Sequence, residues 1–126
     1  MADEPKKRWG MTPDEWELAK RQAEGLLLSR ARRRGTVTYT ELCEAITVAA
    51  IRPYSWKMIA LLDEVCSEED AARGIVLATL VVRADTGRPG RGYFTWAERA
   101  GHDVSDPDAY WLAQAEAVWE SFAEGG

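Results

Sequence analysis

Apolar residues recur at helical spacing in the first third of the chain. Between residues 12 and 34 they share one helical face: Trp16, Ala19, Ala23, Leu26 and Leu27. Thr12-Pro13-Asp14-Glu15 combines a capping box with a proline at the first helical position, and Gly35 is a natural C-terminal stop. This pattern predicts one long helix over residues 12–34.

Two more helices and a short strand are predicted before residue 75. Residues 36–38 are β-branched and predict a small strand. Thr38 or Thr40 can cap the helix that follows, whose predicted buried side is Leu42, Cys43 and Ile46. Ser55 can cap a third helix, which has two adjacent apolar rows. The row predicted to face the core is Trp56, Ile59, Leu62 and Cys66. The row beside it is Met58, Leu61 and Val65. The start signal at residues 67–70 predicts that this helix breaks there and restarts, ending at Gly74.

Residues 75–96 predict a β-hairpin. Residues 75–82 are almost wholly apolar and rich in β-branched side chains, as in a strand covered on both faces. Residues 85–92 contain three glycines and a proline, which predicts a tight loop. Residues 93–96 are aromatic and β-prone, so we expect the chain to return there as a second strand, anchored by Trp96.

The C-terminal part is predicted to be helical. A short helical turn over residues 95–100 ends at Gly101, and Asp106-Pro107 starts the last helix. Its inner face is predicted to be apolar: Trp111, Leu112, Ala115, Val118, Trp119 and Phe122. Four tryptophans fall on predicted apolar stripes and are expected in the core: Trp16, Trp56, Trp111 and Trp119.

The order of these elements predicts the fold class. Helix, short strand, two helices, strand, glycine-rich loop and strand is the order of a winged helix-turn-helix domain. We therefore expect a mainly helical α+β protein of winged-helix type with a long C-terminal helix. The single domain, 1–126, would comprise a flexible segment at 1–11, a core at 12–96 and a helical extension at 97–126.

Part of the chain resembles a known module. Gly35-Thr-Val-Thr-Tyr39, the helix that follows, Val81-Val82-Arg83-Ala-Asp85 and Gly92-Tyr93 resemble the winged DNA-binding domain of alkylguanine-DNA alkyltransferases and alkyltransferase-like proteins. The resemblance covers about residues 35–93 and implies a DNA-binding winged helix. The family's nucleophile motif, Pro-Cys-His-Arg, would fall just before Val81, where this chain has Leu77-Ala-Thr-Leu80. The resemblance therefore implies binding without alkyl transfer.

Composition narrows the class of protein. The 126 residues are 46% hydrophobic with six tryptophans, which excludes a disordered chain. No apolar run has the length of a membrane span, and the N-terminus lacks the pattern of a secretory signal, so a cytoplasmic location with no membrane partner is expected. Cys43 and Cys66 have no CxxC spacing and are interpreted as reduced core residues.

The formal net charge of −5 is unevenly distributed. Residues 1–34 carry an excess of positive charge, whereas residues 93–126 are strongly acidic. An acidic protein can bind nucleic acid only through a local basic patch.

Three groups of residues are candidates for that patch. The first is the loop arginines Arg83, Arg88 and Arg91, which suit phosphate contacts, although they could also only solvate a loop. The second is the start of the third helix, with Arg52, Tyr54, Ser55 and Lys57. The third is Arg32, Arg33 and Arg34 next to Arg30, which also suit a helix C-terminus.

No catalytic or metal site is predicted. His102 with Asp103, Asp106 and Asp108 is the one cluster with metal-ligand chemistry, but two of the aspartates have helix-start roles, so no metal or cofactor is expected. The third helix carries several acidic residues that would repel phosphates: Asp63, Glu64, Glu68, Glu69 and Asp70.

Two functions follow from these patterns. The first is a small non-enzymatic nucleic-acid-binding protein, accessory or regulatory, that contacts duplex DNA or another nucleic acid mainly through phosphates. The alternative is a protein-interaction module whose acidic helices dock a basic partner or form a homodimer.

Overall fold

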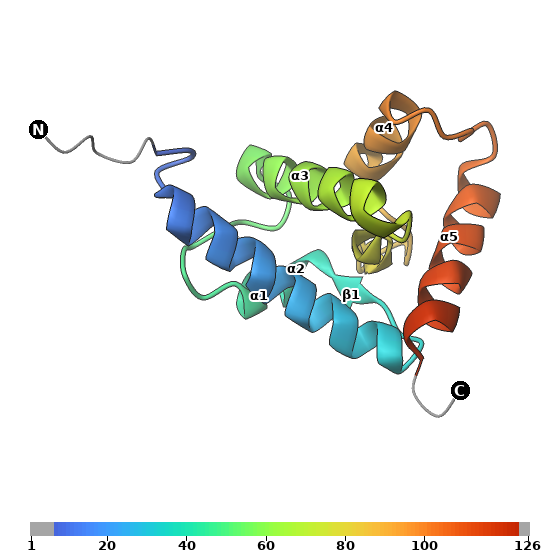
Figure 1. Cartoon of the computed structure of the whole chain (residues 1–126), viewed down its shortest axis with the longest axis horizontal. Helices are drawn as coiled ribbons and strands as arrows, with labels where there is room; N and C mark the ends of the chain where they lie inside the picture. Colours follow the sequence, from blue (N-terminus) through green and yellow to red (C-terminus); the bar gives the residue numbers. More distant parts are fainter. Residues whose placement is uncertain (1–6, 124–126) are drawn as a thin grey trace, which may run out of the picture.

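The computed structural model describes residues 7–123, which form five α-helices, one 3₁₀ helix and a two-stranded sheet (Figure 1). The elements are α1 (Pro13–Arg32), β1 (Val37–Thr38), α2 (Tyr39–Ala45), α3 (Trp56–Arg73), the 3₁₀ helix η1 (Leu77–Leu80), β2 (Val81–Val82), α4 (Arg91–Arg99) and α5 (Pro107–Phe122). The protein is thus mainly helical with a small β component, as predicted. No described helix has the length and apolarity needed to cross a membrane.

Helix α1 begins where its sequence predicts. The Thr12 hydroxyl accepts a hydrogen bond from the Glu15 amide at 3.2 Å, and the Glu15 carboxylate accepts one from the Thr12 amide at 2.8 Å. This capping box satisfies two backbone donors that a helix start otherwise leaves unpaired. The buried face of α1 combines three alanines with larger side chains: Trp16, Ala19, Lys20, Ala23, Leu27 and Ala31.

Helix α3 is continuous, so the predicted break at residues 67–70 is wrong. Glu68 lies within the helix and bonds Lys20 of α1, while Glu69 is buried between helices. These acidic residues serve tertiary contacts instead of a new helix start. The helix ends at Gly74, whose φ of +68° is the left-handed conformation that favours glycine.

Two glycines of similar surroundings are expected to respond oppositely to substitution by alanine. Gly25 lies inside α1 and Gly74 at the end of α3, and a Cβ would meet nothing within 4 Å at either position. We expect Gly25→Ala to raise the free energy of unfolding by about 0.5–1 kcal/mol, because alanine restricts the unfolded chain and favours helix. Gly74→Ala should lower it by about 1 kcal/mol through left-handed strain. Urea denaturation of the pair measures both, and equal shifts would contradict this account.

The predicted hairpin over residues 75–96 is wrong. Only Val81–Val82 is a strand, and it pairs in parallel with β1, Val37 opposite Val81 and Thr38 opposite Val82. Residues 77–80 form η1, and residues 93–96 lie within α4. Residues 83–90 form a loop closed by the Arg83 amide, which donates to the Arg88 carbonyl at 2.8 Å.

The physical reason lies in burial. All four residues of η1 are buried. The segment is therefore apolar because it lies in the core, and not because it is a strand paired with a neighbour on each side. In the following segment, Tyr93, Trp96 and Ala97 are the buried residues, and their spacing is helical. The aromatic content of residues 93–96 indicated a strand, but the helical spacing of the buried residues indicated the helix that forms.

Helix α5 is part of the core. The Trp111 indole donates a buried hydrogen bond to the Thr79 carbonyl at 2.8 Å, and the Trp119 indole donates to the Gly35 carbonyl at 2.9 Å. These bonds fix α5 against η1 and the end of α1, along one side of the molecule (Figure 1). The predicted inner face is correct for Trp111, Ala115 and Val118, and Trp119 and Phe122 are half-buried, but Leu112 is exposed.

The core stripe predicted for α3 is wrong in part. The buried face is the adjacent row Met58, Leu61 and Val65, joined by Cys66. Trp56 is 75% exposed, contrary to its predicted core position, and Ile59 is 40% exposed. Both rows are apolar at helical spacing, so sequence periodicity alone does not decide which of them faces inward.

The predicted flexible segment 1–11 is described only from residue 7. Arg8 and Met11 exchange two backbone hydrogen bonds of 2.9 Å, and the Met11 side chain is buried. The Arg8 guanidinium also forms an ion pair with Glu64 of α3. Residues 8–11 are therefore an ordered turn against the helices, and residues 1–6 lie outside the described part.

Candidate functional site

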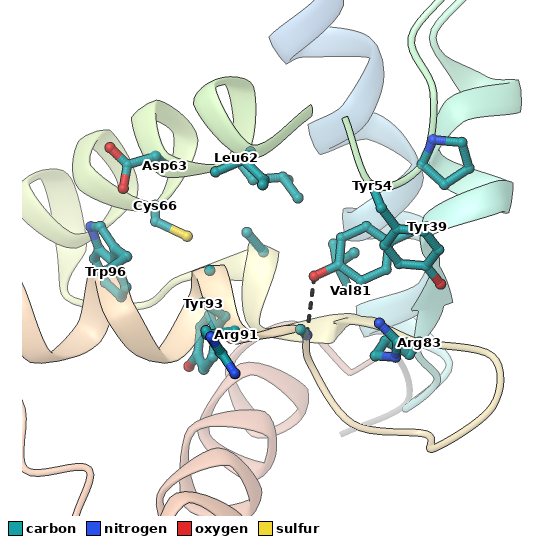
Figure 2. Close-up of a pocket in the computed structure, with 15 residues that line it drawn as sticks. Tyr39, Tyr54, Leu62, Asp63, Cys66, Val81, Arg83, Arg91, Tyr93 and Trp96 are labelled. Atoms are coloured by element: carbon teal, nitrogen blue, oxygen red, sulfur yellow. Dashed lines mark hydrogen bonds between the residues drawn. The ribbon is translucent and has the colours of Figure 1, made fainter. Parts of the chain in front are cut away.

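A pocket of about 170 Å³ opens between the start of α3, the start of α4 and the β1–α2 junction (Figure 2). Aromatic side chains form much of its lining, with Tyr39 and Tyr54 at one end and Trp96 at the other (Figure 2). The other lining residues come from several segments: Pro53, Ile59, Leu62, Asp63, Cys66, Ala78, Val81, Arg83, Gly90, Arg91, Gly92 and Tyr93. Most of this surface is apolar, which suits a flat, weakly polar group.

Hydrogen bonds hold the aromatic lining in place. The Gly90 amide donates to the Tyr39 hydroxyl at 3.1 Å, and a Cβ on Gly90 would lie 3.0 Å from that same oxygen. Glycine therefore lets the loop contact Tyr39 closely. The Tyr93 and Thr79 hydroxyls are 2.9 Å apart in the buried floor, so Tyr93 cannot rotate freely.

Three exposed or half-buried residues line the open side of the pocket, Tyr54, Arg83 and Arg91, and we call them the rim. The Arg83 guanidinium lies 5.0 Å from the centre of the Tyr54 ring and donates two hydrogen bonds of 3.0 Å to Asp85. Arg83 begins the loop 83–90 and Arg91 follows it as the first residue of α4, and both line the pocket (Figure 2). The rim therefore places two cations beside an aromatic hollow.

The third loop arginine does not belong to the rim. Arg88 bonds the Asp108 carboxylate at 3.3 Å, and its guanidinium lies 4.9 Å from the centre of the Trp111 ring. Both partners belong to α5. Arg88 thus fixes the loop to the C-terminal helix.

The residues predicted at the start of α3 divide into two groups. Arg52 and Tyr54 are exposed there, and Tyr54 belongs to the rim. The Ser55 hydroxyl accepts from the Met58 amide and donates to the Arg52 carbonyl, so its role is to cap the helix. Lys57 is half-buried, and its ammonium donates to the Ala50 carbonyl at 3.4 Å.

The cluster Arg32, Arg33 and Arg34 lies at the other end of the molecule. These residues end α1 next to Gly35, which is bonded by Trp119 of α5, and none of them lines the pocket. Arg30, the neighbour of this cluster, is bound to Glu41 at 2.6 Å. The structure therefore does not bring the arginines of α1 and of the loop onto one site.

The acidic residues of α3 have cationic partners within the chain. Glu64 and Glu68 bond the Lys20 ammonium at 3.0 and 2.9 Å, and Asp63 bonds Arg99. Although burial opposes it, the hydrogen bonds from Lys20 and Trp16 lower the pKa of Glu64. These carboxylates are neutralised locally and repel an approaching phosphate less than their number suggests.

The pocket contains no activated nucleophile. Cys66 lines it, but burial raises the pKa of its thiol well above the ordinary value, so the sulfur stays protonated at neutral pH. Cys66 therefore serves as an apolar wall.

The cluster around His102 does not converge on one point. Asp103 accepts from the Ser105 amide, Asp106 caps α5 through the Ala109 amide, and Asp108 bonds Arg88. Among the described residues, carboxylates come together elsewhere, at Glu17, Glu64 and Glu68, and the Lys20 ammonium lies between them. That centre already holds its cation.

Sequence reasoning did not identify the pocket walls. Tyr39 and Tyr93 appeared only within the quoted resemblance, and Trp96 only as an anchor for a strand. The available signal was the helical spacing of Tyr93, Trp96 and Ala97, combined with Gly90 as a close-approach position. No family model matches this chain, and neither the curated proteins nor the solved structures contain a match to it.

Proposed function

We propose that this protein binds nucleic acid without catalysing a reaction, through the pocket and its rim. The observation that carries the proposal is the pair Arg83 and Arg91 beside an aromatic-lined hollow of about 170 Å³. Arginine guanidiniums suit phosphate oxygens, and aromatic side chains suit the faces of bases. The two requirements of a nucleotide unit, a charged backbone and a flat ring, are thus met side by side.

The arrangement of elements supports a winged helix-turn-helix interpretation as part of this proposal. The helices α2 and α3 follow β1, and the loop 83–90 follows β2, in the order of the resembling alkyltransferase-like domain. Two features differ from the predicted scaffold: residues 46–55 make a longer connection than the usual turn of about 3–4 residues, and no hairpin forms among the described residues. DNA as the ligand and a cytoplasmic location remain predictions.

The alternative of a protein-interaction module also remains a prediction. It depended on the acidic third helix and the acidic C-terminal helix, and in the third helix the structure engages Asp63, Glu64 and Glu68 in ion pairs within the chain. A basic partner would have to displace these internal cations. The rim therefore favours nucleic acid over a basic protein.

Removing both rim arginines should weaken binding of a labelled oligonucleotide. We expect Arg83→Ala with Arg91→Ala to weaken it about ten-fold or more in low salt, since two charge-assisted contacts are lost. The dependence of log K on log salt should become shallower by about 0.7–0.9 for each phosphate contact removed. Fluorescence anisotropy at about 50 and 200 mM salt measures both quantities.

The matched control removes two arginines that lie outside the pocket. Arg21→Ala with Arg33→Ala changes the net charge equally, and both side chains are exposed on α1. This control should retain most of the affinity. The proposal fails if the wild-type protein does not bind in low salt, or if the two double variants lose affinity equally.

A further inference from the structure

An exposed apolar surface adjoins the pocket at the start of α3. Trp56 is 75% exposed, the largest exposed fraction among the large hydrophobic side chains of the described chain, and Tyr54 is 55% exposed. Trp56 lies three positions before Ile59, which lines the pocket. Residues three apart on a helix are neighbours on one face, so the Trp56 ring lies one turn from the pocket. We call Tyr54 and Trp56 the aromatic ledge.

Packing does not account for Trp56. The α3 side chains that enter the core are Met58, Leu61 and Val65, and among residues 7–123 the Trp56 indole forms no side-chain hydrogen bond, ring pair or cation contact. The other strongly exposed tryptophan, Trp9, lies in the turn before α1 and is 48% exposed. A single exposed hydrophobic residue is ordinary, so the case for a contact surface depends on the aromatic pocket and the cations next to Trp56.

The charges around the ledge select the kind of ligand. Arg52 and Lys57 flank the ledge in the sequence, and Arg91 lines the adjoining pocket. Because Arg83 is paired with Asp85 and Asp63 with Arg99, these pairs cancel, and Arg52, Lys57 and Arg91 supply the excess positive charge. The surrounding charge therefore attracts a polyanion.

The size of the surface disfavours a folded protein as the occupant. A stable protein interface buries at least about 1,000 Å² around a dry apolar centre. The ledge has two aromatic side chains, extended only by Ile59, and charged groups interrupt it on several sides. Rings interspersed with cations are instead the pattern by which proteins hold single strands.

Resting on the proposed function, we propose that the ligand is a single-stranded nucleic acid, and that Trp56 stacks on an unpaired base next to the nucleotide held at the pocket. A duplex keeps its base faces covered by neighbouring bases, so it offers the indole nothing to stack on. Base–aromatic stacking tolerates any sequence, because every base has a flat face. The protein should therefore prefer single strands to duplexes of the same length, with little preference among sequences.

The test compares a single-stranded oligothymidylate, the corresponding oligouridylate and a DNA duplex of equal length by anisotropy. We expect tighter binding of the single strands to the wild-type protein, and Trp56→Ala should weaken that binding about ten-fold while leaving duplex binding unchanged. Trp56→Phe, which keeps a ring, should retain most of the affinity. Trp9→Ala is the matched control, because it substitutes an exposed tryptophan that lies outside the pocket and the ledge.

Intrinsic fluorescence gives an independent readout of stacking. Adding oligothymidylate should quench the emission of the wild-type and Trp9→Ala proteins, whereas Trp56→Ala should lose most of that quenching. Because Trp56 is exposed, the variant should keep the wild-type melting temperature.

The outcomes separate this inference from the proposed function. The inference is overturned if duplex and single strands bind equally, or if binding is salt-sensitive but unchanged by Trp56→Ala. Either result leaves the proposed role of the rim arginines in nucleic-acid binding unaffected. Preference for the duplex also overturns the inference. Absence of binding to any of the three probes overturns both.

Discussion

Replacing Glu69 with glutamine is expected to raise the free energy of unfolding at about pH 9 by about 2–4 kcal/mol, and to change it little at about pH 5. Glu69 is 3% exposed, and its Oε2 atom has no hydrogen-bond partner; the Arg73 guanidinium lies 3.5 Å from this oxygen and lowers the pKa less than burial raises it. Burial, together with the neighbouring Glu24 carboxyl, raises the pKa of Glu69 to about 8. The folded protein therefore holds this proton across a pH range in which the unfolded chain releases it.

The direction of the pH effect follows from that difference. An unfolded glutamate ionises near its ordinary value of 4.5, whereas the folded group ionises near 8. Between these values the folded state binds more protons, so wild-type stability falls as pH rises, by up to about 1.4 kcal/mol per pH unit. Glutamine has no proton to lose, keeps an acceptor for the Ala78 amide and can donate to Glu24.

Urea denaturation followed by tryptophan fluorescence at about pH 5, 7 and 9 measures the effect. Glu98→Gln, at an exposed position on α4, removes one negative charge as a control and should follow the wild-type profile. Glu24→Gln should flatten the wild-type profile in part, because it removes one of the groups that raise the pKa of Glu69. Parallel profiles for the wild-type and Glu69→Gln proteins would disprove this assignment.

Lys20→Met is expected to lower the free energy of unfolding by about 2–4 kcal/mol at neutral pH. The Lys20 side chain is 2% exposed, and its ammonium lies 2.9–3.0 Å from carboxylates of Glu17, Glu64 and Glu68. Although burial opposes it, hydrogen bonds to Glu68, Glu17 and Glu64 raise the pKa of Lys20. Methionine would fill the space but leave three carboxylates close together, with only Glu64, among the described residues, still paired, through Arg8.

Two comparisons identify the cause of that loss. Arg21→Met removes a neighbouring exposed cation and should cost less than about 0.5 kcal/mol. Adding Glu64→Gln to Lys20→Met should restore part of the stability, because it relieves the carboxylate repulsion. A loss in Lys20→Met no larger than that in Arg21→Met would show that the ion pairs contribute little.

The sequence determined the local starts and ends of helices. The capping box at Thr12, the Ser55 cap, the Asp106 cap and the stop at Gly74 lie where the residues predict them. Of the two predicted alternatives for α2, Thr38 is the cap, and α1 ends at Arg32, before the predicted stop at Gly35. Each of these helix starts and ends depends mainly on contacts within about four residues along the chain, whereas the start signal at residues 67–70 was overridden by the contacts of Glu68 with Lys20. The mainly helical α+β class follows from these signals.

Tertiary structure decided which apolar surfaces became buried. Residues 77–80 have β-branched and apolar neighbours but form η1, because α1 and α5 cover them and a single partner strand pairs with β2 alone. Likewise, α3 has two apolar rows, and its packing selected Met58 and Leu61 over Trp56 and Ile59. The type of a side chain indicates whether it tends to be buried. Which segment covers it depends on parts of the chain that are distant in sequence.

The same distinction holds for the candidate site. The sequence identified the arginines of the loop and the aromatic start of the third helix as residues suited to a polyanion. Only the folded chain assigned Arg88 to Asp108 and Trp111, left Arg83 and Arg91 beside the pocket, and exposed Trp56 next to it. The residue type gives the chemistry of a side chain, but Arg88 meets Asp108, which lies 20 positions away, only when the helices pack.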